Sequence, residues 1–170
     1  MVINSDIILR GSVWRETADA YAAIFKPRTN YDVFLVSAAI GVVYDTRKET
    51  VDDDSGQDIS IPRTVFNGRI DAFEKLLQTA VLSSGTIDYS DEERLKLTFS
   101  GEDDDFNRVQ FLVEFANFGV EKMAELVGID DTETMEGLKN FLVGTVKGSN
   151  FDISEISDDV IAESIAEYET

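Results

Sequence analysis

Between residues 106 and 127, apolar side chains recur in alternating steps of three and four, a spacing that places them on one face of an α-helix. The positions are Phe106, Val109, Val113, Ala116, Val120, Met123 and Val127. Such a stripe has to be buried against other apolar surface. The sequence therefore predicts a long helix, and Gly119 inside it predicts a bend or a close contact with a neighbouring helix.

This stripe suits either the core of the domain or the interface of a dimer. We favour the core, because the pattern lasts only about three heptads and lacks the flanking Lys/Glu pairs that direct coiled-coil pairing. A homodimer remains an open alternative.

Most of the remaining chain also has helical spacing. Helices are predicted over 12–25, with Ser12 as the cap and Lys26-Pro27 as the end, and over 69–82. A further helix from Thr132 is expected to bury Met135, Leu138, Phe141 and Leu142. Ser90 and Glu93 form a capping box for a short helical turn.

Two segments are less regular. Residues 31–45, with Asn30 as a candidate cap, are apolar almost all round and therefore buried, although Val and Ile favour a strand while length favours a helix. A short extended segment is expected near 59–66. The predicted fold is mainly α: a compact single-domain helical bundle over 1–148, followed by an acidic amphipathic C-terminal tail or helix over 149–170.

The composition excludes several kinds of chemistry. The 170 residues include neither Cys nor His, so thiol nucleophiles, thiolate zinc sites and imidazole general bases are absent. The acidic loop around Asp52, Asp53, Asp54 and Asp58 does not match an EF-hand, because with Gly56 in sixth place the first position is Val51. No glycine-rich phosphate-binding motif is present. We therefore expect no cofactor, no metal and no enzymatic activity.

The charge is the second strong feature. The chain has 34 acidic and 15 basic residues and a net charge of −19. Up to Gly85 there are 12 acids and 9 bases, and from Thr86 onward 22 acids and 6 bases. This imbalance fits a surface that attracts basic partners, and it equally fits the surface of a halophilic protein. The apolar runs are too short for a signal peptide or a membrane span, so a cytoplasmic protein is expected.

The C-terminal segment combines aliphatic residues at helical spacing with seven acids and no Lys or Arg after a Gly-Ser-Asn break. A terminal amphipathic helix of this kind is typical of helix-in-groove recognition. The residues predicted to bind a partner are Ile156, Val160, Ile161, Ile165, Asp158, Asp159 and Glu163.

The bases lie mainly in the first half of the chain. If folding gathers them on one face, they are candidate contacts for a phosphate backbone, and the residues concerned are Arg47, Lys48, Arg63 and Arg69. Scattered surface bases are the simpler interpretation. Direct binding to DNA is not expected from a chain of this net charge.

Three segments resemble one family. They are YDVFLVSAAIGVVYDTRKE, IPRTVF and FLVEFANFGVEKMAELV, between Tyr31 and Val127. Together they resemble the small accessory proteins called DNA phosphorothioation-associated (Dnd system-associated) protein four. Members are largely helical and are encoded beside prokaryotic gene clusters that install or police sulfur in the DNA backbone. The aspartate-rich loop and the acidic tail depart from the family pattern.

The resemblance implies a non-catalytic accessory or adaptor protein of a DNA phosphorothioation-linked modification or antiviral defence system. Its partners would be larger proteins of that system, contacted through protein–protein interactions. Two alternatives stay open: an acidic DNA mimic that inhibits a DNA-binding protein, and a weak DNA-binding accessory that uses the basic N-terminal half.

Overall fold

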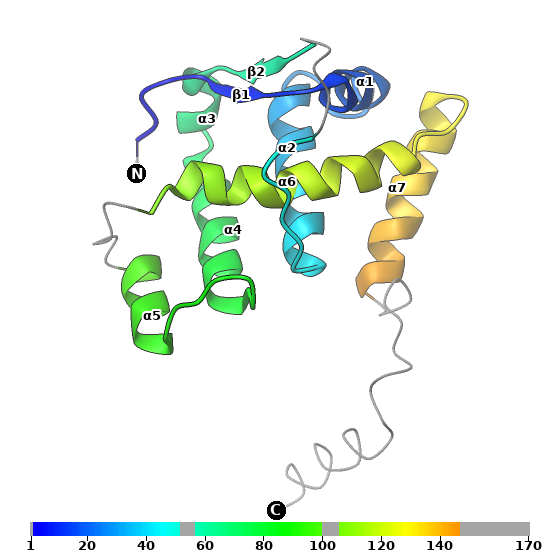
Figure 1. Ribbon diagram of the computed structural model, residues 1–170. Coiled ribbons are helices and arrows are strands. Elements are labelled where there is room, and N and C mark those ends of the chain that lie inside the picture. Colours follow the sequence, from blue (N-terminus) through cyan, green and yellow to red (C-terminus); the bar gives the residue numbers. More distant parts are fainter. Residues whose placement is uncertain (1, 52–56, 100–105, 147–170) are drawn as a thin grey trace, which may run out of the picture.

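The computed structural model describes residues 2–51, 57–99 and 106–146, which form a mainly helical fold with one small sheet (Figure 1). Two helices make its centre: α2 (Thr29–Val43) and α6 (Arg108–Glu125), which cross each other in Figure 1. Around them lie α1 (Ser12–Ala20), α4 (Ile70–Ser83), α5 (Asp91–Phe99) and α7 (Asp131–Val146). The predicted mainly-α fold is confirmed. No helix in these ranges combines the length and apolar character needed to cross a membrane.

The contact between α2 and α6 depends on two glycines. A Cβ atom on Gly119 would lie 1.8 Å from the carbonyl oxygen of Ser37, and one on Gly41 would lie 2.1 Å from the carbonyl oxygen of Phe115. The two backbones therefore touch, because each glycine offers no side chain to hold the helices apart. The close contact predicted at Gly119 is confirmed, and its partner is α2.

The ambiguous segment over 31–45 is a helix. It begins at Thr29 with Arg28 as N-cap, so Asn30 does not cap it; the Asn30 side chain instead donates a hydrogen bond to the Ser60 carbonyl at 2.9 Å. Its burial on several sides explains the all-round apolar pattern, since α1, α4 and α6 all contact it.

An antiparallel pair of three-residue strands, β1 (Ile7–Leu9) and β2 (Ile59–Ile61), covers one end of the fold (Figure 1). Ile7 pairs with Ile61 and Leu9 with Ile59, and these four side chains are buried. The extended segment expected over 59–66 is thus confirmed only to Ile61. After Pro62 the chain turns into the short helix α3 (Arg63–Asn67).

Aromatic side chains fill the space between α2, α3 and α4. Phe66 and Phe73 meet edge to face with ring centroids 4.8 Å apart, and Tyr31 meets Phe66 at 5.7 Å. These rings are almost completely buried. Pairs with this geometry contribute beyond the area they bury, and they fix α3 and α4 against α2.

Predicted details are wrong in three of the helices. Helix α1 ends at Ala20 instead of 25, and its N-cap is Gly11 at φ 108° instead of Ser12. In α6, Val127 is 40% exposed because the helix ends at Glu125. In α7, Leu138 is buried as predicted, whereas Met135 and Leu142 are 56% and 42% exposed.

Candidate protein-docking site

An apolar groove lies between the C-terminal half of α2 and the last turns of α7. Its volume is 140 Å³. The residues that line it are Val36, Ala39, Ile40, Val43, Tyr44, Phe141, Leu142 and Thr145. None of these side chains is charged, so the groove is suited to an apolar side chain.

The groove exists because α2 is apolar on more faces than its neighbours cover. One face packs on α6 at Gly41, and another carries Phe34 into the aromatic cluster. The remaining face, with Val36 and Val43, looks towards α7. Helix α7 is held there by the stacking of Tyr44 on Phe141, with centroids 6.5 Å apart and planes 13° from parallel.

Exposed apolar residues extend the groove. Val43 on α2 is 48% exposed, and Leu142 and Val143 on α7 are 42% and 43% exposed. Met135 lies on the same face of α7 as Leu142, seven residues before it. Adjacent exposed aliphatic side chains of this kind are typical of a surface that contacts another protein.

The volume decides between two kinds of ligand. Pockets for small molecules usually measure about 300–1,000 Å³. The 140 Å³ groove is well below that range and matches a pocket for a protruding side chain of a protein partner.

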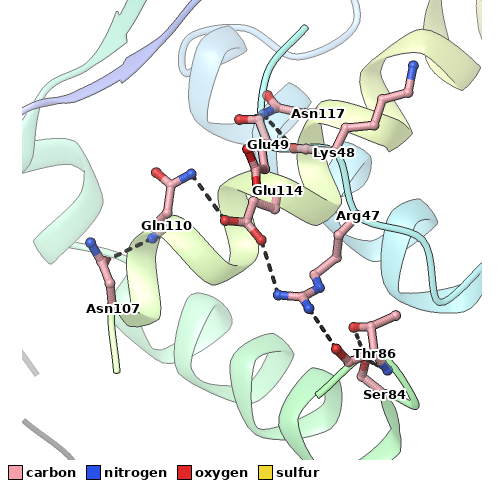
Figure 2. Close-up of polar contacts among 9 residues, drawn as sticks. All are labelled: Arg47, Lys48, Glu49, Ser84, Thr86, Asn107, Gln110, Glu114 and Asn117. Carbon is pink, nitrogen blue, oxygen red and sulfur yellow. Dashed lines mark hydrogen bonds and ion pairs between the residues drawn. The ribbon is translucent and has the colours of Figure 1, made fainter. Parts of the chain in front are cut away.

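A polar cluster lies along α6 (Figure 2). The Arg47 guanidinium donates to the carboxylate of Glu114 at 3.1 Å and to the carbonyl of Thr86 at 2.8 Å, and it lies 5.1 Å above the ring of Phe111. Gln110 donates to the other carboxylate oxygen of Glu114 at 3.4 Å. Arg47 therefore ties the segment after α2 to α6 and to the turn that follows α4.

The neighbouring residues extend this attachment. Lys48 forms an ion pair with Glu121 at 2.5 Å, and its backbone N–H donates to the carbonyl of Glu114 at 2.9 Å. The buried Asn117 amide donates to the carbonyls of Lys48 and Glu49 at 3.0 and 3.2 Å and accepts from the indole of Trp14 at 3.2 Å. The polar cluster thus holds residues 47–49 against α6.

The other two candidate phosphate contacts lie at α3. The Arg63 guanidinium donates to the carbonyl of Asn4 at 3.1 Å, and its backbone N–H donates to Asp6 at 2.9 Å. Arg69 is the N-cap residue of α4, and its carbonyl accepts from the hydroxyl of Tyr31 at 2.7 Å. Arg47 and Lys48 are therefore adjacent on one segment and paired with carboxylates, whereas Arg63 and Arg69 belong to a different part of the fold.

The predicted partner-binding residues cannot be compared with the structure. They lie outside the described residues, as do the tail that contains them and the Asp52–Asp54 part of the acidic loop, and they are Ile156, Val160, Ile161, Ile165, Asp158, Asp159 and Glu163.

Shifted pKa values arise from burial and from local hydrogen bonds. Burial raises the pKa of Tyr21 to about 12 and also raises the pKa values of Tyr31 and Asp32. Hydrogen bonds from Ser90 lower the pKa of Glu93. Neither the groove nor the polar cluster contains any of these four residues. In the described ranges, no three acidic side chains are grouped so that they could hold a metal ion.

Sequence reasoning did not find the groove. The available signal is the excess of apolar residues in 31–45 together with Leu142, which helical spacing predicts to be in the core. Which of these side chains stay uncovered depends on how α7 sits on α2, and the spacing of residues within one helix does not specify that.

Comparisons with known proteins add no relative. No family model, no curated protein and no solved structure matches the chain. The resemblance to the phosphorothioation-associated accessory proteins therefore stays a prediction.

Proposed function

We propose that this chain is a non-catalytic accessory protein that acts by binding a larger protein. The observation that carries the proposal is the uncharged groove between α2 and α7, with Val43 and Leu142 exposed on opposite sides. A partner that inserts an apolar side chain there removes both rims from water, and burial of apolar surface is the main source of affinity in protein complexes.

The charge supports a basic partner. A chain of net charge −19 attracts positively charged proteins over distances of the order of the Debye length, about 8 Å at physiological salt. Proteins that handle DNA carry such positive surfaces. We place the chain in the cytoplasm of a prokaryote, as an accessory of a DNA phosphorothioation-linked modification or defence system, on the strength of the three resembling segments.

The test is co-purification with defined partners. The full chain, carrying an affinity tag, is co-expressed with each product of the genes that flank its own. We expect at least one stoichiometric complex that survives gel filtration in 0.15 M salt. If none of these products binds, the assignment to such a system is wrong.

A second candidate is a DNA mimic, and one observation favours it. Of the 34 acidic residues, 14 lie in 52–54, 102–105 and 152–169, so much of the negative charge is concentrated in short stretches of sequence. A mimic would displace DNA from a DNA-binding protein, and added salt would abolish the effect. The adaptor predicts instead that the partner binds the chain and DNA at the same time.

The third candidate, weak binding to DNA, has less support. Two of its four candidate contacts, Arg47 and Lys48, already pair with Glu114 and Glu121. A gel shift at low salt with plain and sulfur-modified DNA is expected to show no complex with the chain alone.

A further inference from the structure

We infer that the groove between α2 and α7 binds the apolar stripe of a basic amphipathic helix that belongs to the partner. This inference rests on the proposed function and adds the place of contact and the chemistry of the partner. Two neighbouring helices with an apolar groove between them form the receptor side of helix-in-groove recognition.

The dimensions of the surface fit such a helix. Met135 and Leu142 are seven residues apart on α7, so they lie about 10 Å apart along the helix axis. That distance is two helical turns, the spacing between anchors at i and i+7 of a bound helix. The 140 Å³ groove beside Leu142 takes one anchor, and the exposed side chain of Met135 contacts the other.

Methionine is suited to this position. Its side chain is unbranched and polarizable, so it adjusts to the shape of the residue that packs on it. Met135 is 56% exposed in a helix where Leu138, one turn away, is buried in the core. The apolar strip of α7 therefore continues from the core to the surface.

The negative charge near the groove indicates which kind of helix binds there. From Glu121 to Val146, six acids stand against two lysines, and the acids are Glu121, Glu125, Asp130, Asp131, Glu133 and Glu136. Asp131, Glu133 and Glu136 lie in the first turns of α7, on either side of Met135, so the acidic side chains flank the Met135 end of the apolar strip and not the groove itself. Lysine and arginine residues flanking the apolar stripe of a bound helix complement this charge.

The same charge argues against two other occupants. A second copy also carries −19, so like-charge repulsion opposes its approach. The C-terminal stretch of this chain has aliphatic residues at helical spacing, but it has seven acids from Asp152 onward and no Lys or Arg there. A basic helix is attracted to this negatively charged protein, whereas a second copy and the C-terminal stretch are both repelled by it.

The probe is a synthetic 20-residue peptide with Leu at i, i+3, i+4 and i+7 spacing and Lys or Arg elsewhere. A scrambled peptide of identical composition, with no continuous apolar face, controls for attraction by charge alone. Binding to the full chain is measured by fluorescence anisotropy at 0.15 M salt. We expect the ordered peptide to bind at least tenfold more tightly than the scrambled one.

Two substitutions locate the site. Leu142→Asp and Val43→Asp add charge to the groove at positions that are already partly exposed, so the fold should persist. Leu95→Asp is the matched control, because Leu95 is 51% exposed on α5, at the opposite end of α6 from α7 (Figure 1). We expect the groove variants to bind the ordered peptide at least tenfold more weakly and the control to bind it with unchanged affinity. The melting temperatures of Leu142→Asp and Leu95→Asp are expected to be equal.

Each other outcome overturns the inference. Equal binding of the scrambled peptide means attraction by charge only, and equal weakening by Leu95→Asp means that the loss is not specific to the groove. Tighter binding of the ordered peptide, but not of the scrambled one, by the full chain carrying Ile156→Asp and Val160→Asp means that its own C-terminal stretch occupies the groove. A smaller oligomer in Leu142→Asp means a second copy.

The two proposals fail separately. If a flanking gene product still binds the Leu142→Asp chain with undiminished affinity, the groove inference is wrong while the adaptor function stands. If the peptide binds the groove but no flanking gene product binds, the place of contact stands and the assignment to the DNA-linked system is wrong.

Discussion

Gly119 is the residue on which the packing of the two central helices depends most directly. Replacement by Ala would place a methyl group 1.8 Å from the backbone oxygen of Ser37, and a backbone atom cannot move aside as a side chain does. We expect Gly119→Ala to lower the free energy of unfolding by at least about 2 kcal/mol, the scale of overpacking in a closed core. Urea unfolding followed by circular dichroism measures it.

Gly68→Ala is the control for that substitution. Gly68 has φ −69°, and its nearest non-neighbouring atom would be 3.2 Å from the added Cβ. We expect a change below about 1 kcal/mol, because the conformation suits Ala and the unfolded chain loses entropy. Equal effects of the two substitutions would contradict the close approach of α2 and α6.

Tyr21 is expected to make stability depend on alkaline pH. Its ring is buried and its hydroxyl donates to the carbonyl of Met123 at 3.2 Å, and burial raises its pKa from 10.0 to about 12. Between these values the unfolded state loses the proton while the folded state keeps it, so stability falls as the pH rises. The contribution of the protonated Tyr21 side chain to the free energy of unfolding is complete below pH 10 and disappears towards pH 12.

The variant Tyr21→Phe isolates this effect. Near pH 8 the wild type should be more stable by about 1 kcal/mol, because only it has the hydrogen bond to Met123. Above pH 10 the advantage should shrink by up to about 1.4 kcal/mol per pH unit and then reverse. Urea unfolding of both proteins at pH 8, 10 and 11 measures the difference; a constant difference would mean that Tyr21 ionises equally in both states.

Among the elements, α5 is the one whose stability is most local. Its principal packing partner is α4, and in α5 only Leu97 is buried. Its first turn is closed by Ser90 and Glu93: the Ser90 N–H donates to the carboxylate at 2.8 Å, and the Glu93 N–H donates to the Ser90 hydroxyl at 3.4 Å. Opening of α5 should therefore not require unfolding of the core.

We expect Ser90→Ala to destabilise α5 by about 1 kcal/mol, the usual cost of losing an N-cap side chain. Hydrogen exchange of the amides over 91–99 should become about fivefold faster, while the urea midpoint of the whole fold stays unchanged. Ser90→Asp, which restores a cap acceptor, should bring exchange back towards the wild-type rate. Uniform acceleration across α2 and α6 would show that α5 does not open on its own.

The elements that could be predicted are those with local causes. The capping box at Ser90 and the spacing in 69–82 act within a few residues, and α5 and α4 follow from them. Strand β1 could not be predicted, because Ile7–Leu9 becomes a strand only by pairing with residues about fifty positions away. Helix α1 ends early at Ala20, and the next residue, Tyr21, donates its hydroxyl to the carbonyl of Met123 on α6. No local sequence pattern reveals this contact.

The same distinction applies to the site. The sequence identifies Arg47 and Lys48 as candidate bases, but their carboxylate partners, Glu114 and Glu121, lie more than sixty residues away. The groove is harder still to predict, because helical spacing assigned Leu142 to a core-facing stripe. Spacing identifies a face of a helix, whereas exposure depends on how far the neighbouring helix extends over it.

For the whole molecule, charge is divided unequally between the described fold and the remaining sequence. The described ranges contain 20 acids and 14 bases, and the other residues contain 14 acids with Lys147 as their single base. A halophilic protein is expected to spread its excess carboxylates along the whole chain, where they hold water at the surface. The described ranges are only modestly acidic, which favours charge used for partner binding.

Salt should therefore affect binding much more than folding. We expect the melting temperature of the full chain to change by less than about 4 °C between 0.15 and 2 M KCl, a shift that corresponds to roughly 1 kcal/mol in a domain of this size. Over the same range the ordered basic peptide should lose at least tenfold in affinity, because 1 M salt reduces the Debye length to about 3 Å. A melting temperature that rises steadily into molar KCl would instead assign the acidity to salt adaptation, and the −19 charge would then carry no information about a partner.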